Sequence, residues 1–201
     1  MPVNNQQGRD RPKPNKQAPS VRNDDRRVRK TQVALIGAFV ELVLEKRYDA
    51  ITIQDLLDRA DVGRSTFYAH YRGKDDLLAK SFIGMLAMLD REIDRDGPGG
   101  RRVAPVRELF RHIGEARKFQ QALARAHVLE RQYHAGVEYM SGTIERRLAA
   151  LSGTPGAVPL PVKAQALAGT LFALLRWWVD HDAPYTPEQM DAMYHAMAAT
   201  G

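Results

Sequence analysis

Residues 61–73 of the chain read DVGRSTFYAHYRG, and this stretch decides the fold. If residues 64–72 form a helix, Phe67 and Tyr71 lie four positions apart and share one buried edge. The opposite side of that helix carries two small residues, a tyrosine and an arginine: Ser65, Ala69, Tyr68 and Arg72. An ordinary solvated helix face would carry Glu, Lys and Gln, whereas this helix contains no acidic residue. We therefore expect the outward face to be kept open for a partner.

Two further helices are predicted before this stretch. The first ends near Arg47 and is indicated by apolar residues at helical spacing: Val33, Ile36, Val40 and Val43, widened by Phe39 and Leu44. The second begins with Thr52 and Asp55, spaced as in a capping box, and its inward side chains are Ile53, Leu56, Leu57 and Ala60. Three helices of about eighteen, nine and eight residues, with a tight glycine-containing turn before the last, describe a helix-turn-helix unit. In that motif the second helix of the pair enters the major groove of DNA.

The rest of the chain also has helical periodicity, and no stretch alternates with a period of two. Gly73 is expected to cap the DNA-facing helix in a left-handed conformation, and Gly97–Gly100 to end the helix that follows. Later helices are expected near residues 106–113, 119–126, 129–151, 162–181 and 187–199. The sequence therefore predicts an all-α protein.

The charge is concentrated at one end of the chain. Residues 1–30 hold nine Lys or Arg and three Asp, so their net charge of +6 equals that of all 201 residues. Residues 1–25 contain four prolines and few large apolar side chains, and we expect them to form a disordered basic tail. Such a tail attracts polyanions through counterion release, although a merely solubilising extension has the same composition.

Composition excludes several other classes of protein. The chain has no cysteine, so disulfides and thiolate metal sites are impossible. No apolar region follows the N-terminal charges, and the most apolar segment, LAGTLFALLRWWV at 167–179, is too short to span a bilayer. We therefore expect a cytoplasmic protein that does not enter the membrane.

The order V-G-x-S-T-F-Y-x-H-Y at 62–71, followed by K-x-x-L-L at 74–78, resembles the DNA-binding domain of TetR-family transcriptional regulators. This resemblance covers about residues 31–78. A looser one, FALLRWWVDHDAPYTPEQMDAMYHAM at 172–197, is to the regulatory domain of one branch of that family. Together they imply a tail at 1–25, a three-helix helix-turn-helix DNA-binding domain at 26–76, and a helical effector-binding and dimerisation domain at 77–201.

The resemblance also implies which side chains contact double-stranded DNA: Thr52, Gln54, Arg64, Ser65, Thr66, Tyr68, His70 and Lys74. Arg64 and Ser65 lead the recognition helix, where an arginine can bind guanine O6 and N7 in a bidentate pair. Two alternatives stay open, because Tyr68 could instead pack on the first helix and Thr52 could serve only as a cap. Tyr71 is assigned to the core, since it shares the edge of Phe67.

An effector pocket is implied between the fourth and seventh helices, suited to an apolar or aromatic small molecule. Its candidate lining is Phe82, Met85, Phe110, Phe119, Tyr133 and Trp177, and plain core packing is the alternative for each. An effector that favours one conformer would swing the helix that begins at Lys74 and so release DNA.

The family's last two helices form a four-helix interface with a second copy. Candidate interface residues are Ala164, Ala168, Leu171, Leu175, Met193 and Met197, and packing inside one subunit is the alternative. A homodimer would read a palindromic operator whose half-sites lie about 34–36 Å apart, or a multiple of that. Repression is the family's usual mode.

No phosphate loop, dinucleotide fingerprint, zincin motif or nucleophile elbow occurs, so we expect no enzyme, catalytic residue, cofactor or metal. His127, Glu130, His134 and Glu138 share a helical face that could ligate a divalent metal, but an ordinary solvated face is favoured. A helical protein-interaction scaffold without specific DNA binding is the rival function.

Overall fold

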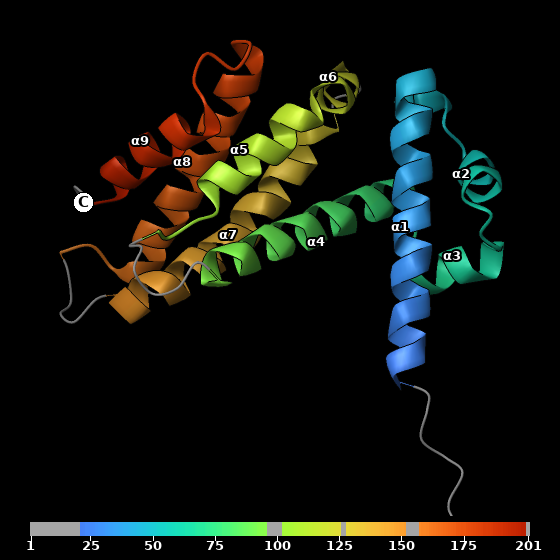
Figure 1. The fold of residues 1–201 in the computed structure, drawn as a ribbon, viewed down its shortest axis with the longest axis horizontal. Helices are drawn as coiled ribbons and strands as arrows, with labels where there is room; N and C mark the ends of the chain where they lie inside the picture. Colours follow the sequence, from blue (N-terminus) through green and yellow to red (C-terminus); the bar gives the residue numbers. More distant parts are fainter. Residues whose placement is uncertain (1–20, 96–101, 126–127, 152–156, 200–201) are drawn as a thin grey trace, which may run out of the picture.

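The computed structural model describes residues 21–95, 102–125, 128–151 and 157–199, and all regular secondary structure in these ranges is helical (Figure 1). The first helix, α1 (Val21–Glu45), begins inside the segment expected to be a disordered tail. No proline or glycine occurs between Pro19 and Gly37, so nothing in the sequence interrupts a helix there. Residues 1–20 lie outside the described part of the chain.

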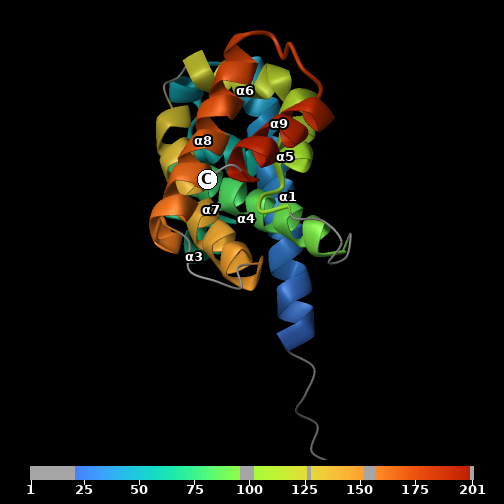
Figure 2. The same ribbon diagram turned by 90° about the vertical axis from the view of Figure 1, so that its left-hand side faces the viewer.

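The N-terminal helices form the predicted helix-turn-helix arrangement. After α1 come a 3₁₀ turn (Tyr48–Ala50), which was not predicted, then α2 (Ile53–Ala60) and α3 (Arg64–His70). Both short helices lie on the same side of α1, as Figure 1 shows. In the turned view of Figure 2, the N-terminal part of α1 projects beyond the other helices.

The buried face of α1 differs from the predicted one. Phe39 and Val43 are buried as predicted, but Leu35 and Leu42 are buried with them, whereas Val33 and Leu44 are exposed. Nearly every position from 33 to 44 is apolar or small, so helical spacing alone does not determine which side faces the core.

A hydrophobic cluster under α1 holds the N-terminal helices together. It includes Leu56 and Leu57 of α2, whose burial confirms the predicted inward side, and Phe67 of α3. It continues into α4 (Lys74–Arg95) and further along the chain, to residues on either side of the gap at 126–127: Leu77, Leu78, Leu123 and Val128. The cluster therefore extends past residue 76, which is the predicted end of the DNA-binding domain.

The C-terminal helices bury a second, larger cluster. They are α5 (Val106–Glu115), α6 (Arg117–Arg125), α7 (Leu129–Leu151), α8 (Leu160–Asp180) and α9 (Pro187–Ala199). All of them except α6 contribute to this cluster, as does α4, whereas α6 packs into the first cluster. Helix α7 packs along α8, α5 packs on α9, and α4 packs on α7. The α7–α8 approach is close, since a Cβ built on Gly136 would lie 2.4 Å from the Phe172 ring. None of the described helices combines the length and hydropathy needed to cross a bilayer.

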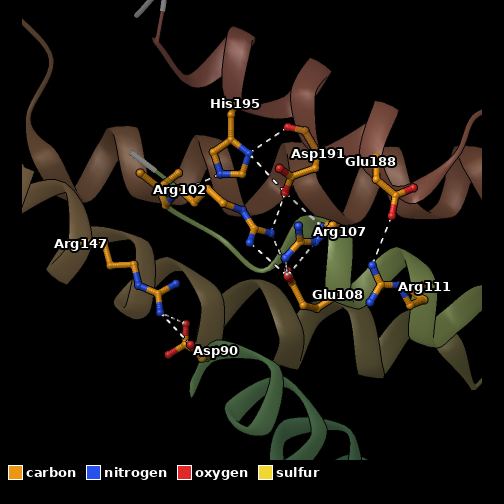
Figure 3. A network of polar contacts seen from close by, with 10 residues as sticks. Asp90, Arg102, Arg107, Glu108, Arg111, Arg147, Glu188, Asp191 and His195 are labelled. Atoms are coloured by element: carbon orange, nitrogen blue, oxygen red, sulfur yellow. Dashed lines mark hydrogen bonds and ion pairs between the residues drawn. The ribbon is translucent and has the colours of Figure 1, made fainter. Parts of the chain in front are cut away.

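A polar network ties the start of α5 to α9 (Figure 3). The Arg102 guanidinium donates to both oxygens of Glu108, at 3.0 and 2.5 Å, and to Asp191 Oδ1 at 2.8 Å. The backbone N–H of Val103 donates to His195 Nε2 at 3.1 Å, while His195 Nδ1 lies 2.9 Å from the carbonyl oxygen of Asp191. Because Glu108 is buried, these bonds fix how α9 lies on α5.

The end of α3 corrects one expectation. Gly73 does not adopt the left-handed conformation expected of a helix cap. Instead α3 ends at His70, Tyr71 is extended with φ −135°, and the N–H of Arg72 donates to Asp76 Oδ2 at 2.9 Å. The backbone becomes extended at Tyr71, and this places the Tyr71 side chain in the core.

Candidate nucleic-acid interface

The start of α2 is held by a complete capping box. Thr52 Oγ1 accepts from the N–H of Asp55 at 3.1 Å, and Asp55 Oδ2 accepts from the N–H of Thr52 at 2.7 Å. Lys46 pairs with the same carboxylate at 2.7 Å, and this hydrogen bond, followed by those from Thr52, lowers the pKa of Asp55. The cap holds the first turn of α2 with Thr52 and Gln54 exposed to solvent.

The turn between α2 and α3 is tight, and hydrogen bonds between side chains connect the two helices across it. Asp61 supplies the left-handed residue, with φ 52°, and Gly63 is the extended N-cap of α3. Arg64 Nη2 donates to Gln54 Oε1 at 2.7 Å, and Gln54 Nε2 donates to Asp58 Oδ1 at 2.7 Å. The Arg64 guanidinium is therefore held beside the start of α2 rather than left to sample all rotamers.

Helix α3 buries one edge and exposes the other. Phe67 and Tyr71 are buried with ring centroids 5.5 Å apart, which confirms the predicted core edge. Tyr68 is 51% exposed and contacts Phe67 edge-on at 5.3 Å, so it packs within its own helix and still faces solvent. Arg64, Ser65 and Ala69 are exposed and Thr66 is half-buried.

His70 and Lys74 lie at the far end of this surface. The His70 ring is half-buried beside Tyr71. The Lys74 ammonium donates to the carbonyl oxygens of Tyr48 at 2.8 Å and Ile51 at 2.9 Å, and lies 4.4 Å from the centre of the Tyr48 ring. The structure thus gives Lys74 a role inside the domain that the sequence analysis did not predict.

A cavity of about 950 Å³ lies between α1, α4 and α6. Of the predicted pocket residues, Phe82, Met85 and Phe119 line it. The other three do not: Phe110 packs on Trp178 at 5.1 Å, Tyr133 on Phe172 at 6.1 Å, and Trp177 is 39% exposed. Spacing along a helix identifies a face but not whether that face borders a cavity, the core or solvent.

Two features of this cavity were not predicted from the sequence. Its wall includes Ile36 and Val40 of α1. Its lining also includes two buried glutamines, Gln120 and Gln132. Gln132 leaves one signal in the sequence, since it interrupts the apolar stripe of α7 three residues after Leu129.

The predicted interface residues divide into two sets. Ala164, Ala168, Leu171 and Leu175 are buried inside the subunit's own core, so their assignment to an interface with a second copy is wrong for this structure. Met193 and Met197 are 39% and 47% exposed. Around them an apolar face of α8 and α9 is open to solvent: Val162, Ala166, Ala173, Trp177, Ala192 and Ala196.

The possible metal face on α7 is solvated where it is described. Glu130, His134 and Glu138 are exposed, and Glu130 pairs with Arg176 at 3.2 Å. His127 lies outside the described residues. Within the described ranges, no cluster of ligating side chains suits a metal ion.

Comparisons with known proteins agree with this arrangement. Residues 35–80 match the family model "Bacterial regulatory proteins, tetR family". The HTH-type (helix-turn-helix) transcriptional regulator YxbF of Bacillus subtilis strain 168 is 46% identical over 55 residues, 27% of this chain and 14% of that protein. YdeS of the same strain is 34% identical over 53 residues, 26% of this chain and 27% of that protein. The matched segments thus span less than a third of these relatives.

Solved structures resemble the chain over most of its length. A TetR transcriptional regulator from Streptococcus agalactiae 2603V is 25% identical with a TM-score of 0.57, covering 89% of this chain and 99% of that one. Lin0861 from Listeria innocua is 20% identical with a TM-score of 0.65, covering 92% and 96%, and shows the same fold. The family model and the sequence relatives therefore assign residues 35–80 to the DNA-binding domain of the TetR family of transcriptional regulators, and the chain resembles a solved TetR regulator over most of its length.

Proposed function

We propose that this protein binds a palindromic DNA operator as a homodimer and regulates transcription in response to a small molecule, with repression as its mode. The observation that carries the proposal is the surface made by Arg64, Ser65 and Tyr68. These side chains are exposed on a helix whose other edge is buried, and no acidic residue lies between Gly63 and Gly73. Small side chains allow the helix to enter a groove, and the absence of acid avoids repulsion by phosphate.

Within this surface the residues take different roles. Arg64 reads a base, since its guanidinium has the fork geometry that fits guanine O6 and N7. Tyr68 contacts a base or phosphate, and Thr52, Gln54, Ser65, Thr66 and His70 fix the position of the domain on the backbone. Lys74 is left out of this set, because its ammonium already donates to carbonyl oxygens of the 3₁₀ turn and Ile51.

The homodimer is supported by the open face of α8 and α9. Small and apolar residues follow that face, and Trp177, Met193 and Met197 stand exposed on it. Two copies joined there would present two recognition helices to one duplex. The cavity between α1, α4 and α6 is the site assigned to the effector.

Selection of bound duplexes from random oligonucleotides tests the proposal. The expected product is a palindrome whose half-sites are centred about 34–36 Å apart or a multiple of that. If the protein selects no sequence over random DNA, the helical scaffold function replaces this one.

Arg64→Ala tests the residue that carries sequence reading. We expect operator affinity to fall about tenfold to a hundredfold in a titration at fixed salt, because one bidentate pair is worth about 1–3 kcal/mol. The dimer should persist. Arg91→Ala, which removes the same charge from an exposed position on α4, is the control and should leave affinity unchanged.

A further inference from the structure

The cavity beside α1 has an apolar wall and one unsatisfied polar group. Its volume of about 950 Å³ falls in the range of small-molecule sites. Apolar side chains of three helices line it, among them Ile36, Val40, Phe82 and Phe119. Much of the wall would be wetted in an empty cavity, so an apolar occupant would release water.

Gln132 is the unsatisfied group. Its side chain belongs to a residue that is 4% exposed, and its Nε2 has no hydrogen-bond partner among the described residues. Gln120, which is 9% exposed and lines the same cavity, also has no side-chain hydrogen bond there. Buried polar groups are nearly always paired, so an unpaired carboxamide in a cavity indicates that a bound molecule supplies the partner.

The two buried polar residues of the lining, Gln120 and Gln132, are uncharged. The half-buried Ser81 also lines the cavity, and its hydroxyl already donates to the carbonyl oxygen of Leu77 at 2.7 Å. The charged lining residues are Glu115 and Lys118, which are exposed, and Arg117 and Asp182, which pair with each other. A charged head group beside Gln132 would lose its hydration without gaining a counter-ion there, which disfavours it.

We propose that this cavity binds a neutral, mainly apolar molecule that carries an uncharged hydrogen-bond acceptor, such as an amide or ketone carbonyl, and that Gln132 Nε2 donates to that acceptor. The inference rests on the proposed function in one respect, which is that the occupant acts as the effector. The same cavity is walled by Ile36 and Val40 of α1, so the occupant contacts a helix of the DNA-binding domain directly.

Decanamide is a suitable probe, measured by displacement of the apolar fluorophore N-phenyl-1-naphthylamine. We expect decanamide to displace the fluorophore more effectively than decanoate or decylammonium, which have the same chain with a charged head. In Gln132→Leu, affinity for decanamide should fall about tenfold, the effect of one lost hydrogen bond, while affinity for the fluorophore stays the same.

Gln132→Leu should also raise the Tm of the free protein by about 2–4 °C, because it removes a buried group without a partner. Loss of binding with a gain in stability is a result that a merely structural glutamine would not give. Gln132→Met repeats the test with a more adaptable side chain. His134→Leu, on the exposed side of the same helix, is the control. It should leave the affinity for decanamide unchanged and should not raise the Tm.

The inference is overturned if decanamide does not displace the fluorophore, if a charged analogue displaces it better, or if both Gln132 variants keep wild-type affinity for decanamide. These measurements contain no DNA, so they stand even if the protein selects no operator and the proposed function falls. Decanamide that binds without changing operator affinity would remove the effector role alone.

Discussion

At the scale of single residues, Lys74 shows how one side chain can serve the fold where a family pattern suggests a ligand. The family resemblance implies that it contacts DNA, yet its ammonium donates to the carbonyls of Tyr48 and Ile51 and lies over the Tyr48 ring. The lysine thus closes the 3₁₀ turn before α2 onto the start of α4. Its ammonium group therefore makes its hydrogen bonds within the domain.

Lys74→Met should therefore cost stability rather than DNA affinity. We expect a loss of about 1–3 kcal/mol in urea unfolding, since two carbonyls lose a charged donor. The slope of log affinity against log salt should stay the same. A slope reduced by about one, with stability unchanged, would instead identify Lys74 as a phosphate contact.

His195 gives the fold a pH dependence of definite sign. Burial lowers the pKa of His195 from its usual 6.5, although the carbonyl and carboxylate of Asp191 act in the opposite direction. Its Nε2 accepts from the N–H of Val103, so a proton there would meet another donor. Arg102 also disfavours the charged ring, while Glu108 favours it less strongly.

Because the folded-state pKa is lowered, the unfolded chain takes up the proton first as pH falls. Stability should therefore decrease as pH drops below about 6.5, by at most about 1.4 kcal/mol for each pH unit. Urea unfolding at pH 7.5 and 5.5 measures this, and His195→Gln, which keeps an acceptor for Val103, should flatten the difference. His134→Gln, the same substitution at an exposed position, should leave that difference unchanged. If it also flattens the difference, surface histidines rather than His195 cause the pH dependence.

At the scale of helices, the α7–α8 crossing depends on one missing side chain. A Cβ at Gly136 would lie 2.4, 2.8 and 3.0 Å from three atoms of the Phe172 ring, which is itself buried. The two helices therefore cannot keep their spacing with any larger residue at 136.

Gly136→Ala should destabilise the protein by about 1–3 kcal/mol in urea unfolding, because overpacking outweighs the better helix propensity of alanine. Gly142→Ala on the same helix is the matched control. A Cβ there meets only the end of the Arg146 side chain at 3.8 Å, so that variant should be as stable as the wild type or more so. Equal effects from the two substitutions would show that the crossing is not tight.

Helix positions were largely predictable from sequence, and their environments were not. The apolar spacing of Val106, Leu109, Phe110 and Ile113 predicted α5, and all four side chains are buried. Capping chemistry at Thr52 identified the start of α2 to the residue. On α1 and α8, by contrast, apolar residues occur on more than one face, so spacing could not separate core, cavity and open surface.

At the scale of the whole molecule, the open apolar face of α8 and α9 is the surface on which the proposed homodimer rests. Met193 lies on this face at 39% exposure, among small residues that allow another helix to approach. Four of the residues predicted to form the interface are instead inside the subunit, because the sequence cannot show which side of α8 the α7 helix covers.

Met193→Glu should convert the dimer to a monomer in light scattering at micromolar concentration, since it places a charge in a dry interface. Operator affinity should fall with it, because one recognition helix then binds alone. Met88→Glu, the same change at an exposed methionine of α4, should leave a dimer. A monomeric wild type would remove the proposed interface.

Phe39 has a consequence for anyone who cuts or recombines this protein. The centre of its ring lies 5.9 Å from that of Tyr48 and 6.2 Å from that of Phe119, and Leu123 and Val128 belong to the same cluster. A fragment that ends at residue 76 would lack the later residues of this cluster and would expose its apolar side chains to water, so it should aggregate. A chimaera that joins this DNA-binding domain to the regulatory domain of another protein must therefore include α6. Otherwise the other domain must supply apolar side chains that cover the same patch.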